Sequence, residues 1–372
     1  MIRLIPSLPA AYVIARVVWP LAEPLALRLG LAAILLVASQ YHLWSRLSSG
    51  SVFAPEFPRP VVILFNWAFG AIALAAVMQL ALDLIALTSL ALPGGGWAIP
   101  AAWRAAVAAA AACLAAAAVR QAVRVPRLKD LAVAIADLPA GFDGYTILHL
   151  TDLHISRLFP AAWARAVVAR ANDLEVDLIV VTGDFIDGSL EARRTDVAPL
   201  RALRARDGVW AVPGNHEYFF DHDAWMRHLT GLGIRILANA HTILRRDGDA
   251  LLLAGVTDRS APATGHPGPD LDAALAGAPP GAPIVLLDHQ PANAARAAAR
   301  GVALQLSGHT HGGMIRGLDR LVARGNAGFV SGAYRVGTMR LYIGNGTGLW
   351  PGFALRLGRP SELTRITLRT GT

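Results

Sequence analysis

The stretch Tyr145-Thr-Ile-Leu-His-Leu-Thr-Asp-Leu-His154 joins a short apolar run to two polar groups. Residues 145–150 predict a buried β-strand, because the run is short and rich in aromatic, β-branched and large apolar side chains. Asp152 and His154 follow the end of this strand. Binding sites in open α/β sheets lie beyond the carboxyl ends of the strands, so the stretch predicts a polar site at one sheet edge.

The same pattern recurs further along the chain. Apolar runs that predict strands lie at 176–182, 208–213, 251–255, 284–287 and 303–306. Helical segments lie between several of them, and this alternation is typical of a layered α/β domain. Polar motifs follow four of these runs. They are Gly183-Asp184-Phe-Ile-Asp187, Gly214-Asn215-His216-Glu217, Asp288-His289 and Gly308-His309-Thr-His311.

These motifs supply carboxylate, imidazole and amide groups. Such a mixture suits Mn, Fe, Zn or Mg better than a thiophilic metal. The single cysteine, Cys113, excludes a thiolate cluster and an intramolecular disulfide. Two cations about 3.5–4 Å apart clamp the attacking and leaving oxygens of a phosphoryl displacement. One motif alone is weak evidence, but the ordered set predicts a dinuclear centre for phosphoryl chemistry.

The motifs, together with the amino-acid sequence of residues 304–313 and 342–367, resemble the calcineurin-like metallophosphoesterase family. Within this family they resemble a bacterial, membrane-anchored subgroup. The resemblance covers about residues 140 to 370. It implies a four-layer αββα sandwich that holds seven ligands to two metals. These ligands are Asp152, His154 and His311 for the first metal, Asn215, His289 and His309 for the second, and Asp184 as the bridge.

The resemblance also implies that a metal-bound hydroxide attacks phosphorus. His216 then donates a proton to the leaving group or stabilises its charge, and Asp187 orients the imidazole of His216. The alternatives without a role in the site are that Asp187 caps a turn and that Asn215 is only a turn residue. Glu217 is expected to support the site or start a helix rather than bind a metal.

Histidines outside the motifs are expected to have no role in the site. His149 lies within an apolar strand and is expected to be structural. His222, His228, His241 and His266 have no motif context and are expected at the surface. The loops around residues 218–225 and 257–270 are expected to set the preference among esters.

The N-terminal third is a different kind of sequence. Hydrophobic residues make up 54% of the chain and charged residues 16%, and the apolar excess lies before residue 125. Apolar stretches at 8–27, 29–44, 61–82 and 97–119 predict an all-α transmembrane region over 1–125 with three or four spans. Arg16 and Pro20 make the first stretch the weakest. A linker over 126–140 and a metallophosphoesterase domain over 141–372 follow. A soluble helical bundle is the alternative for the apolar region.

Basic residues predict the orientation in the membrane. Arg120, Arg124, Arg127 and Lys129 follow the last apolar stretch, whereas the turn Pro93-Gly-Gly-Gly96 carries no charge. By the positive-inside rule, the chain is a multi-pass cell (inner) membrane protein with a cytoplasmic catalytic domain. Arg28 fits the four-span version badly. Binding of lipid phosphate by the same basic run is a second reading.

The function predicted from the sequence is that of a metal-dependent phosphoric ester hydrolase. It uses two divalent ions, manganese first with iron, zinc or magnesium as alternatives. Its substrate is a phosphate ester or pyrophosphate, either a small molecule or a membrane lipid or lipid-linked precursor, and no nucleic acid partner is predicted. A non-catalytic metal-binding membrane scaffold is the main alternative, and a transporter is a third. Ester preference and oligomeric state stay open.

Overall fold

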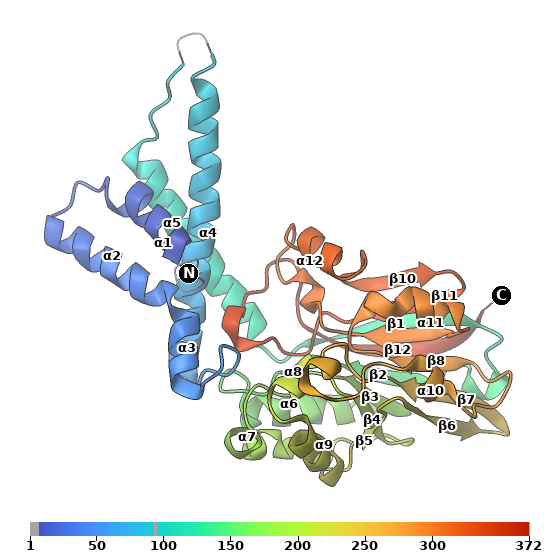
Figure 1. Cartoon of the computed structure of the whole chain (residues 1–372). Helices are drawn as coiled ribbons and strands as arrows, with labels where there is room; N and C mark the ends of the chain where they lie inside the picture. Colours follow the sequence, from blue (N-terminus) through green and yellow to red (C-terminus); the bar gives the residue numbers. More distant parts are fainter. Residues whose placement is uncertain (1–6, 93–94, 372) are drawn as a thin grey trace. The chain divides into compact units, whose positions relative to one another are not determined.

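The computed structural model describes residues 7–92 and 95–371 as two compact units (Figure 1). One unit comprises the chain up to Val123 together with Pro351–Leu355. The other comprises Arg124–Trp350 and the residues from Arg356 onward. Pro93 and Gly94 of the predicted glycine-rich turn lie outside the described residues.

The first sheet of the larger unit has the strand order β1-β12-β2-β3-β4-β5. Strands β2 to β5 are parallel, while β12 runs antiparallel to β2 and parallel to β1. The strands are β1 (Arg127–Ala136), β2 (Thr146–Leu150), β3 (Leu178–Thr182), β4 (Val209–Val212), β5 (Arg235–Ile236) and β12 (Glu362–Gly371). The strands predicted at 145–150, 176–182 and 208–213 are therefore confirmed.

The second sheet has the order β10-β11-β9-β8-β7-β6, with β11, β9, β8 and β7 parallel and an antiparallel strand at each edge. Its strands are β6 (Ala240–Arg246), β7 (Asp249–Gly255), β8 (Ile284–Leu287), β9 (Leu304–Ser307), β10 (Gly332–Val336) and β11 (Met339–Ile343). The predicted strands at 251–255, 284–287 and 303–306 are confirmed as β7, β8 and β9.

The alternation of side chains along β8 shows how the layers form. Val285 and Leu287 point into an apolar core that also contains Ile147 and Val180 of the first sheet. Leu286 points the other way, into a second core with residues of α10 and α11. The sheets therefore pack face to face, with helices outside, as the predicted sandwich requires. The helices of this unit are α6 (Ala161–Asn172), α7 (Leu190–Val197), α8 (Asn215–Phe219), α9 (His222–Gly231), α10 (Leu271–Leu275), α11 (Ala294–Ala299) and α12 (Asp319–Gly325).

The predicted linker, residues 126–140, differs from what the structure contains there. Its residues 127–136 form β1, which pairs along its whole length with β12. Val133 and Ile135 are buried in the core between the sheets, whereas Ala134 between them is exposed. Side chains of β1 are therefore buried at every second residue, whereas those of a flexible linker would not be buried. The pairing partner lies more than 200 residues away, so local sequence could not reveal it.

The smaller unit is helical. Its helices are α1 (Ser7–Val13), the π-helix η2 (Ile14–Val18), α2 (Leu25–Ser39), α3 (Tyr41–Ser49), α4 (Arg59–Ser89) and α5 (Ala101–Ala122). By length and composition α4 and α5 can each cross a membrane. The pair α2 and α3, bent by 52°, is a third candidate if it forms one span. The first predicted stretch gives only a shorter apolar helix, Ser7–Val18.

Small side chains line the buried face of α5. Ala111, Ala115, Ala118 and Ala122 are fully buried and recur every three or four residues. Their spacing places them on one helix face, where small side chains allow helix backbones to approach closely. The alanine-rich run therefore serves packing, as its composition indicates.

Candidate metal centre

The predicted ligands follow their strands at nearly constant spacing. Asp152, Asp184, His289 and His309 each stand two residues beyond the last residue of β2, β3, β8 and β9. Within each sheet these strands are parallel, so their carboxyl ends meet at one edge. Asp152, Asp184 and His309 have φ angles of 52°, 55° and 67°. Left-handed backbone is costly for such residues and often marks functional sites, and here it turns the side chains out of the strand direction.

The glycines beside the ligands are required for two different reasons. Gly183 has φ +82°, a conformation that L side chains rarely adopt. Gly308 is instead needed for space, since a Cβ there would lie 1.9 Å from Oγ1 of Thr151 and 2.3 Å from Oδ2 of Asp152. The need for a sharp turn therefore explains why glycine stands at position 183. The close approach of a ligand explains why glycine stands at position 308.

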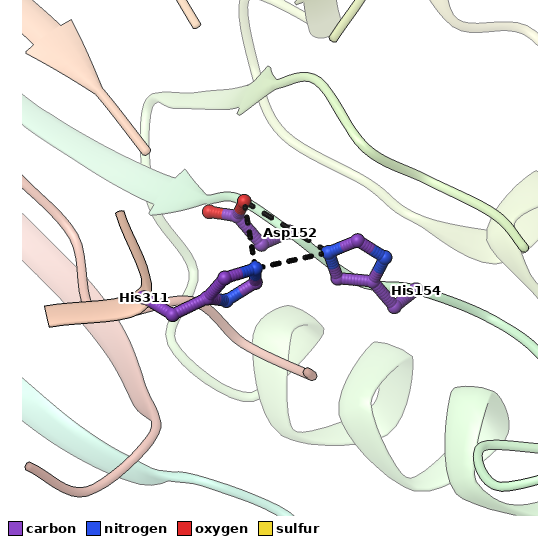
Figure 2. A group of neighbouring side chains, drawn as sticks. All are labelled: Asp152, His154 and His311. Atoms are coloured by element: carbon purple, nitrogen blue, oxygen red, sulfur yellow. Dashed lines mark hydrogen bonds and ion pairs between the residues drawn. The ribbon is translucent and has the colours of Figure 1, made fainter. Parts of the chain in front are cut away.

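Asp152, His154 and His311 form the first group of predicted ligands (Figure 2). Nε2 of His154 lies 3.3 Å from Nε2 of His311, and the Asp152 Oδ1 atom lies 4.0 and 3.7 Å from these two nitrogens. All three residues are buried. Figure 2 shows the two imidazoles and the carboxylate pointing toward a common centre, from the end of β2 and from the loop that follows β9.

Asp184 lies between this group and the second group. Its Oδ2 atom is 3.6 Å from Nε2 of His154 and 3.4 Å from Nε2 of His289. The side-chain oxygen of Asn215 lies 3.0 Å from the same His289 nitrogen and 2.9 Å from Nδ1 of His309. The structure thus brings all seven predicted ligands together, and Asp184 occupies the position that a bridging ligand requires.

The proton positions of two imidazoles are set by their outer contacts. Nδ1 of His289 lies 2.7 Å from the carbonyl oxygen of Thr182, which can only accept. Nδ1 of His154 lies 3.0 Å from a carboxylate oxygen of Asp187. In the neutral rings both Nδ1 atoms therefore carry the hydrogen, and both Nε2 lone pairs face the oxygen of Asp184. These facing lone pairs repel unless a cation lies among them, and outer partners of this kind orient metal-binding histidines.

The pKa shifts of the buried side chains agree with a cation at this centre. Burial raises the pKa of Asp152 above its ordinary value even with His289 nearby. Burial acts in the same direction on Asp184, but His289 and His216 outweigh it and hold that pKa well below its usual range. Burial by itself lowers the pKa of His289, but the Asp184 carboxylate outweighs it and raises that pKa well above its ordinary value. A positive charge is thus strongly favoured between these groups, and a metal ion supplies it by displacing the proton.

The two predicted catalytic residues also lie at this centre. Nδ1 of His216 is hydrogen-bonded to Oδ1 of Asp187, and its Nε2 is 3.9 Å from Oδ2 of Asp184. Burial by itself would lower the pKa of His216, but Asp184 and Asp187 outweigh it and raise the pKa to about 9. His216 is therefore suited to carry a proton at neutral pH. Asp187 holds His154 as well as His216, a double contact that the motif did not reveal.

Some supporting residues give little sign in the sequence. The carboxylate of Glu217 accepts hydrogen bonds from the backbone N–H groups of Gly214, Asp184 and Phe185 at 2.7, 3.0 and 2.7 Å. It therefore fixes two ligand-bearing turns, which favours the supporting role over metal binding. Arg356 is fully buried and donates to the carbonyl oxygen of His311 at 2.9 Å. No motif surrounds Arg356, so only the fold identifies it.

A comparison with known families agrees with this geometry. Residues 145–313 match the family model described as calcineurin-like phosphoesterase. That range contains all seven predicted ligands with His216 and Asp187.

Individual relatives are similar to a large part of the chain. A zebrafish (Danio rerio) "Transmembrane protein with metallophosphoesterase domain" is 32% identical over 67% of this chain. The match spans 58% of that relative, less than two thirds of its length. The "Uncharacterized metallophosphoesterase YkuE" of Bacillus subtilis is 30% identical over 63% of this chain and 82% of its own. A solved structure, the calcineurin-like phosphoesterase YfkN from Bacillus subtilis, aligns with a TM-score of 0.37 at 15% identity over 56% of this chain and 82% of that one.

Proposed function

This chain belongs to the calcineurin-like phosphoesterase family, and from that premise we propose that it hydrolyses a phosphate ester or pyrophosphate at a dinuclear metal centre. One observation carries the proposal. Oδ2 of Asp184 faces the Nε2 lone pairs of His154 and His289 at 3.6 and 3.4 Å, in two groups of buried ligands. A single carboxylate between two imidazole-rich groups supports two cations that share a bridge.

The ligand roles in the proposal follow the two groups. Asp152, His154 and His311 hold one ion, Asn215, His289 and His309 hold the other, and Asp184 bridges. Manganese is proposed first, because carboxylate, amide and imidazole ligands suit it. Two bound divalent ions supply a water of lowered pKa as the nucleophile and neutralise the charge of the phosphoryl group.

His216 moves the proton in this proposal. Its Nδ1 is held by Asp187, so its Nε2, which lies 3.9 Å from Oδ2 of Asp184, is the atom that would face the leaving oxygen. Burial by itself lowers the pKa of this imidazole, but the carboxylates of Asp184 and Asp187 outweigh it and raise that pKa, and a positioned acid of this kind contributes typically about 10²–10⁴-fold to a rate. Asp187 is a positioning residue, because it acts through His216 and His154.

The helical unit gives an indication of the class of substrate. In this proposal the predicted membrane region over 1–125 keeps the reaction near a bilayer surface, which supports a phospholipid or lipid-linked phosphate rather than a nucleic acid as the substrate. Arg120, Arg124, Arg127 and Lys129, around the end of α5 and the start of β1, support a cytoplasmic catalytic domain.

The test uses full-length protein in detergent, stripped of metal. Hydrolysis of p-nitrophenyl phosphate, bis(p-nitrophenyl) phosphate and phosphatidic acid vesicles is measured with and without Mn²⁺. We expect Mn²⁺-dependent activity that Asp184→Asn abolishes and that Asp130→Asn, at an exposed carboxylate of β1, retains. Activity without metal, or full activity in Asp184→Asn, would contradict the proposal. Binding of two ions without hydrolysis of any of the three substrates would favour the scaffold.

A further inference from the structure

A second group of potential metal ligands lies outside the centre described above. Its members are His222 and Asp223 at the start of α9 and His266, which follows the 3-10 helix η5 (Ala261–Thr264). One ligand atom from each residue lies within 4.8 Å of the other two. The sequence predicts His222 and His266 as unremarkable surface residues, yet their side chains are only 13% and 29% exposed.

The tautomer of His266 is set by a neighbouring hydroxyl group. Oγ1 of Thr264 donates its one hydrogen to the carbonyl oxygen of Ala261 at 2.9 Å. Nδ1 of His266 lies 3.0 Å from the same Oγ1, which can then only accept, so this Nδ1 carries the hydrogen. The Nε2 lone pair of the neutral ring therefore faces Oδ1 of Asp223 at 3.3 Å. In that tautomer the Nε2 atom and the Asp223 oxygen can both bind one metal ion.

His222 completes the group. Its Nδ1 lies 3.0 Å from the same Asp223 oxygen, and its Nε2 is buried with no hydrogen-bond partner among the described residues. Burial lowers the pKa of His222, which keeps the ring neutral and able to bind a metal. Tyr218 stacks on this ring at a centroid distance of 4.3 Å and fixes its plane. The geometry thus presents two partly buried imidazoles and one exposed carboxylate to a common point.

We propose that His222, Asp223 and His266 bind a third divalent ion, zinc by preference, separate from the dinuclear centre. Bonds of 2.0–2.2 Å in a tetrahedron separate neighbouring ligand atoms by about 3.3 Å, close to the 3.0 and 3.3 Å found around Asp223 Oδ1. Two imidazoles and a carboxylate with a fourth position for water form a ligand set common for zinc. The hydroxyl of Thr264 is the outer partner that orients His266.

The site joins two segments that the dinuclear centre does not link directly. His222 follows α8, which carries Asn215 and His216, and His266 lies in the loop after β7. These are the two loops expected to set ester preference. Zinc would hold them in one arrangement beside His216, whose ring lies 5.2 Å from that of Phe219 in the same segment. The ion therefore restrains the loops around the catalytic centre.

The test counts bound zinc in the full-length protein. After equilibration with Zn²⁺ and removal of free metal, we expect three ions per chain in the wild type and two in His266→Gln and Asp223→Asn. The matched control is His241→Gln, because His241 lies outside the group and bonds to the carbonyl oxygen of Ala274. This control should keep three ions. Asp184→Asn should lose zinc from the dinuclear centre but keep the ion at His266, so failure of one site is distinguishable from failure of the other.

Trypsin tests the restraint of the loops. Arg259 is exposed in the loop after β7, and zinc should slow cleavage after it in the wild type but not in His266→Gln. Equal zinc content in the wild type, His266→Gln and Asp223→Asn overturns the site. Cleavage at Arg259 that zinc does not change overturns the restraint. Circular dichroism of both variants establishes that they are folded.

Discussion

The two units of the molecule treat their carboxylates in opposite ways, a partly buried one in the helical unit and fully buried ones in the catalytic unit. In the helical unit, Asp83 of α4 receives two hydrogen bonds from Arg16, each 2.8 Å, and one from Gln79 at 2.8 Å. Tyr12 donates a further hydrogen bond. In the catalytic unit, Asp152 and Asp184 accept hydrogen bonds from neutral donors, the backbone N–H groups of His309 and His216 at 3.0 and 2.9 Å, and also face imidazole nitrogens. The first carboxylate is paired with an arginine, whereas the other two face imidazoles across a site suited to a cation.

The difference follows from what surrounds each group. Asp83 lies on a helix long and apolar enough to cross a membrane, where an unpaired charge is costly and no water can compensate it. The catalytic unit instead retains uncompensated negative charge, and that charge is the source of its affinity for metal ions. A buried carboxylate therefore marks a metal site when it faces several imidazoles rather than an arginine.

The largest expected effect separates the two kinds of carboxylate. Asp152→Asn removes a ligand charge from the dinuclear centre, and we expect lost metal and a rate at least about 10³-fold lower, because metal ions contribute several kcal/mol to the transition state. Asp83→Asn should keep wild-type metal content and activity. Metal analysis and steady-state kinetics check both variants. Full metal content in Asp152→Asn would remove the basis of the comparison.

Substitutions in the hydrogen-bond network around Asp83 are expected to lower the stability of the protein without lowering its metal content. Asp83→Leu leaves Arg16 without its carboxylate in apolar surroundings, and we expect about 3 kcal/mol of destabilisation in detergent. The double variant Asp83→Leu with Arg16→Leu should recover most of the loss, since neither charge remains. Thermal unfolding followed by tryptophan fluorescence measures both. Equal stability of the single variant and the wild type would show that Asp83 is not neutralised mainly by Arg16.

Asp187 gives a smaller effect, because it acts through its neighbours. Asp187→Asn weakens the hold on His154 and His216, and we expect about 10–100-fold lower metal affinity or activity. Metal titration and kinetics distinguish these two losses. Ser189→Ala, which removes the side-chain cap of α7 two residues away, is the control and should retain both. An unchanged Asp187→Asn enzyme would favour the reading of Asp187 as a turn cap.

The smallest effect concerns a histidine that binds no metal in this scheme. His149 is buried between the sheets with its Nε2 2.8 Å from Oγ1 of Thr182, and burial lowers its pKa to about 3. The unfolded chain takes up this proton near pH 6.5, so stability is present above that pH and is lost as the pH falls toward 3. The expected loss is about 1 kcal/mol per pH unit just below pH 6. His149→Gln keeps a hydrogen-bonding side chain without the titration, and chemical unfolding at pH 7 and 5 should show a weaker pH dependence for it. An unchanged dependence would mean that His149 is protonated in the folded protein.

Much of the centre is predictable because its residues are local to strand ends. A short apolar strand, a glycine and a ligand lie within four or five residues, so Asp184 and His309 are recognisable from their own surroundings. Asp187 is also placed correctly by its motif, but its second contact, with His154, depends on two loops meeting in space. Glu217 shows the same limit, since the two turns that it fixes lie about 30 residues apart.

By itself, the sequence determined strands β2, β3, β4, β7, β8 and β9, the order of the ligands and the apolar helices α4 and α5, because each depends on side-chain character repeated at short range. Only the tertiary structure decided which carboxylates face an arginine and which face imidazoles. It also placed β1 in the sheet beside β12 and brought His266 to His222 and Asp223. These relations depend on distances of a few ångströms between residues far apart in the chain, and burial and packing set those distances, not local pattern.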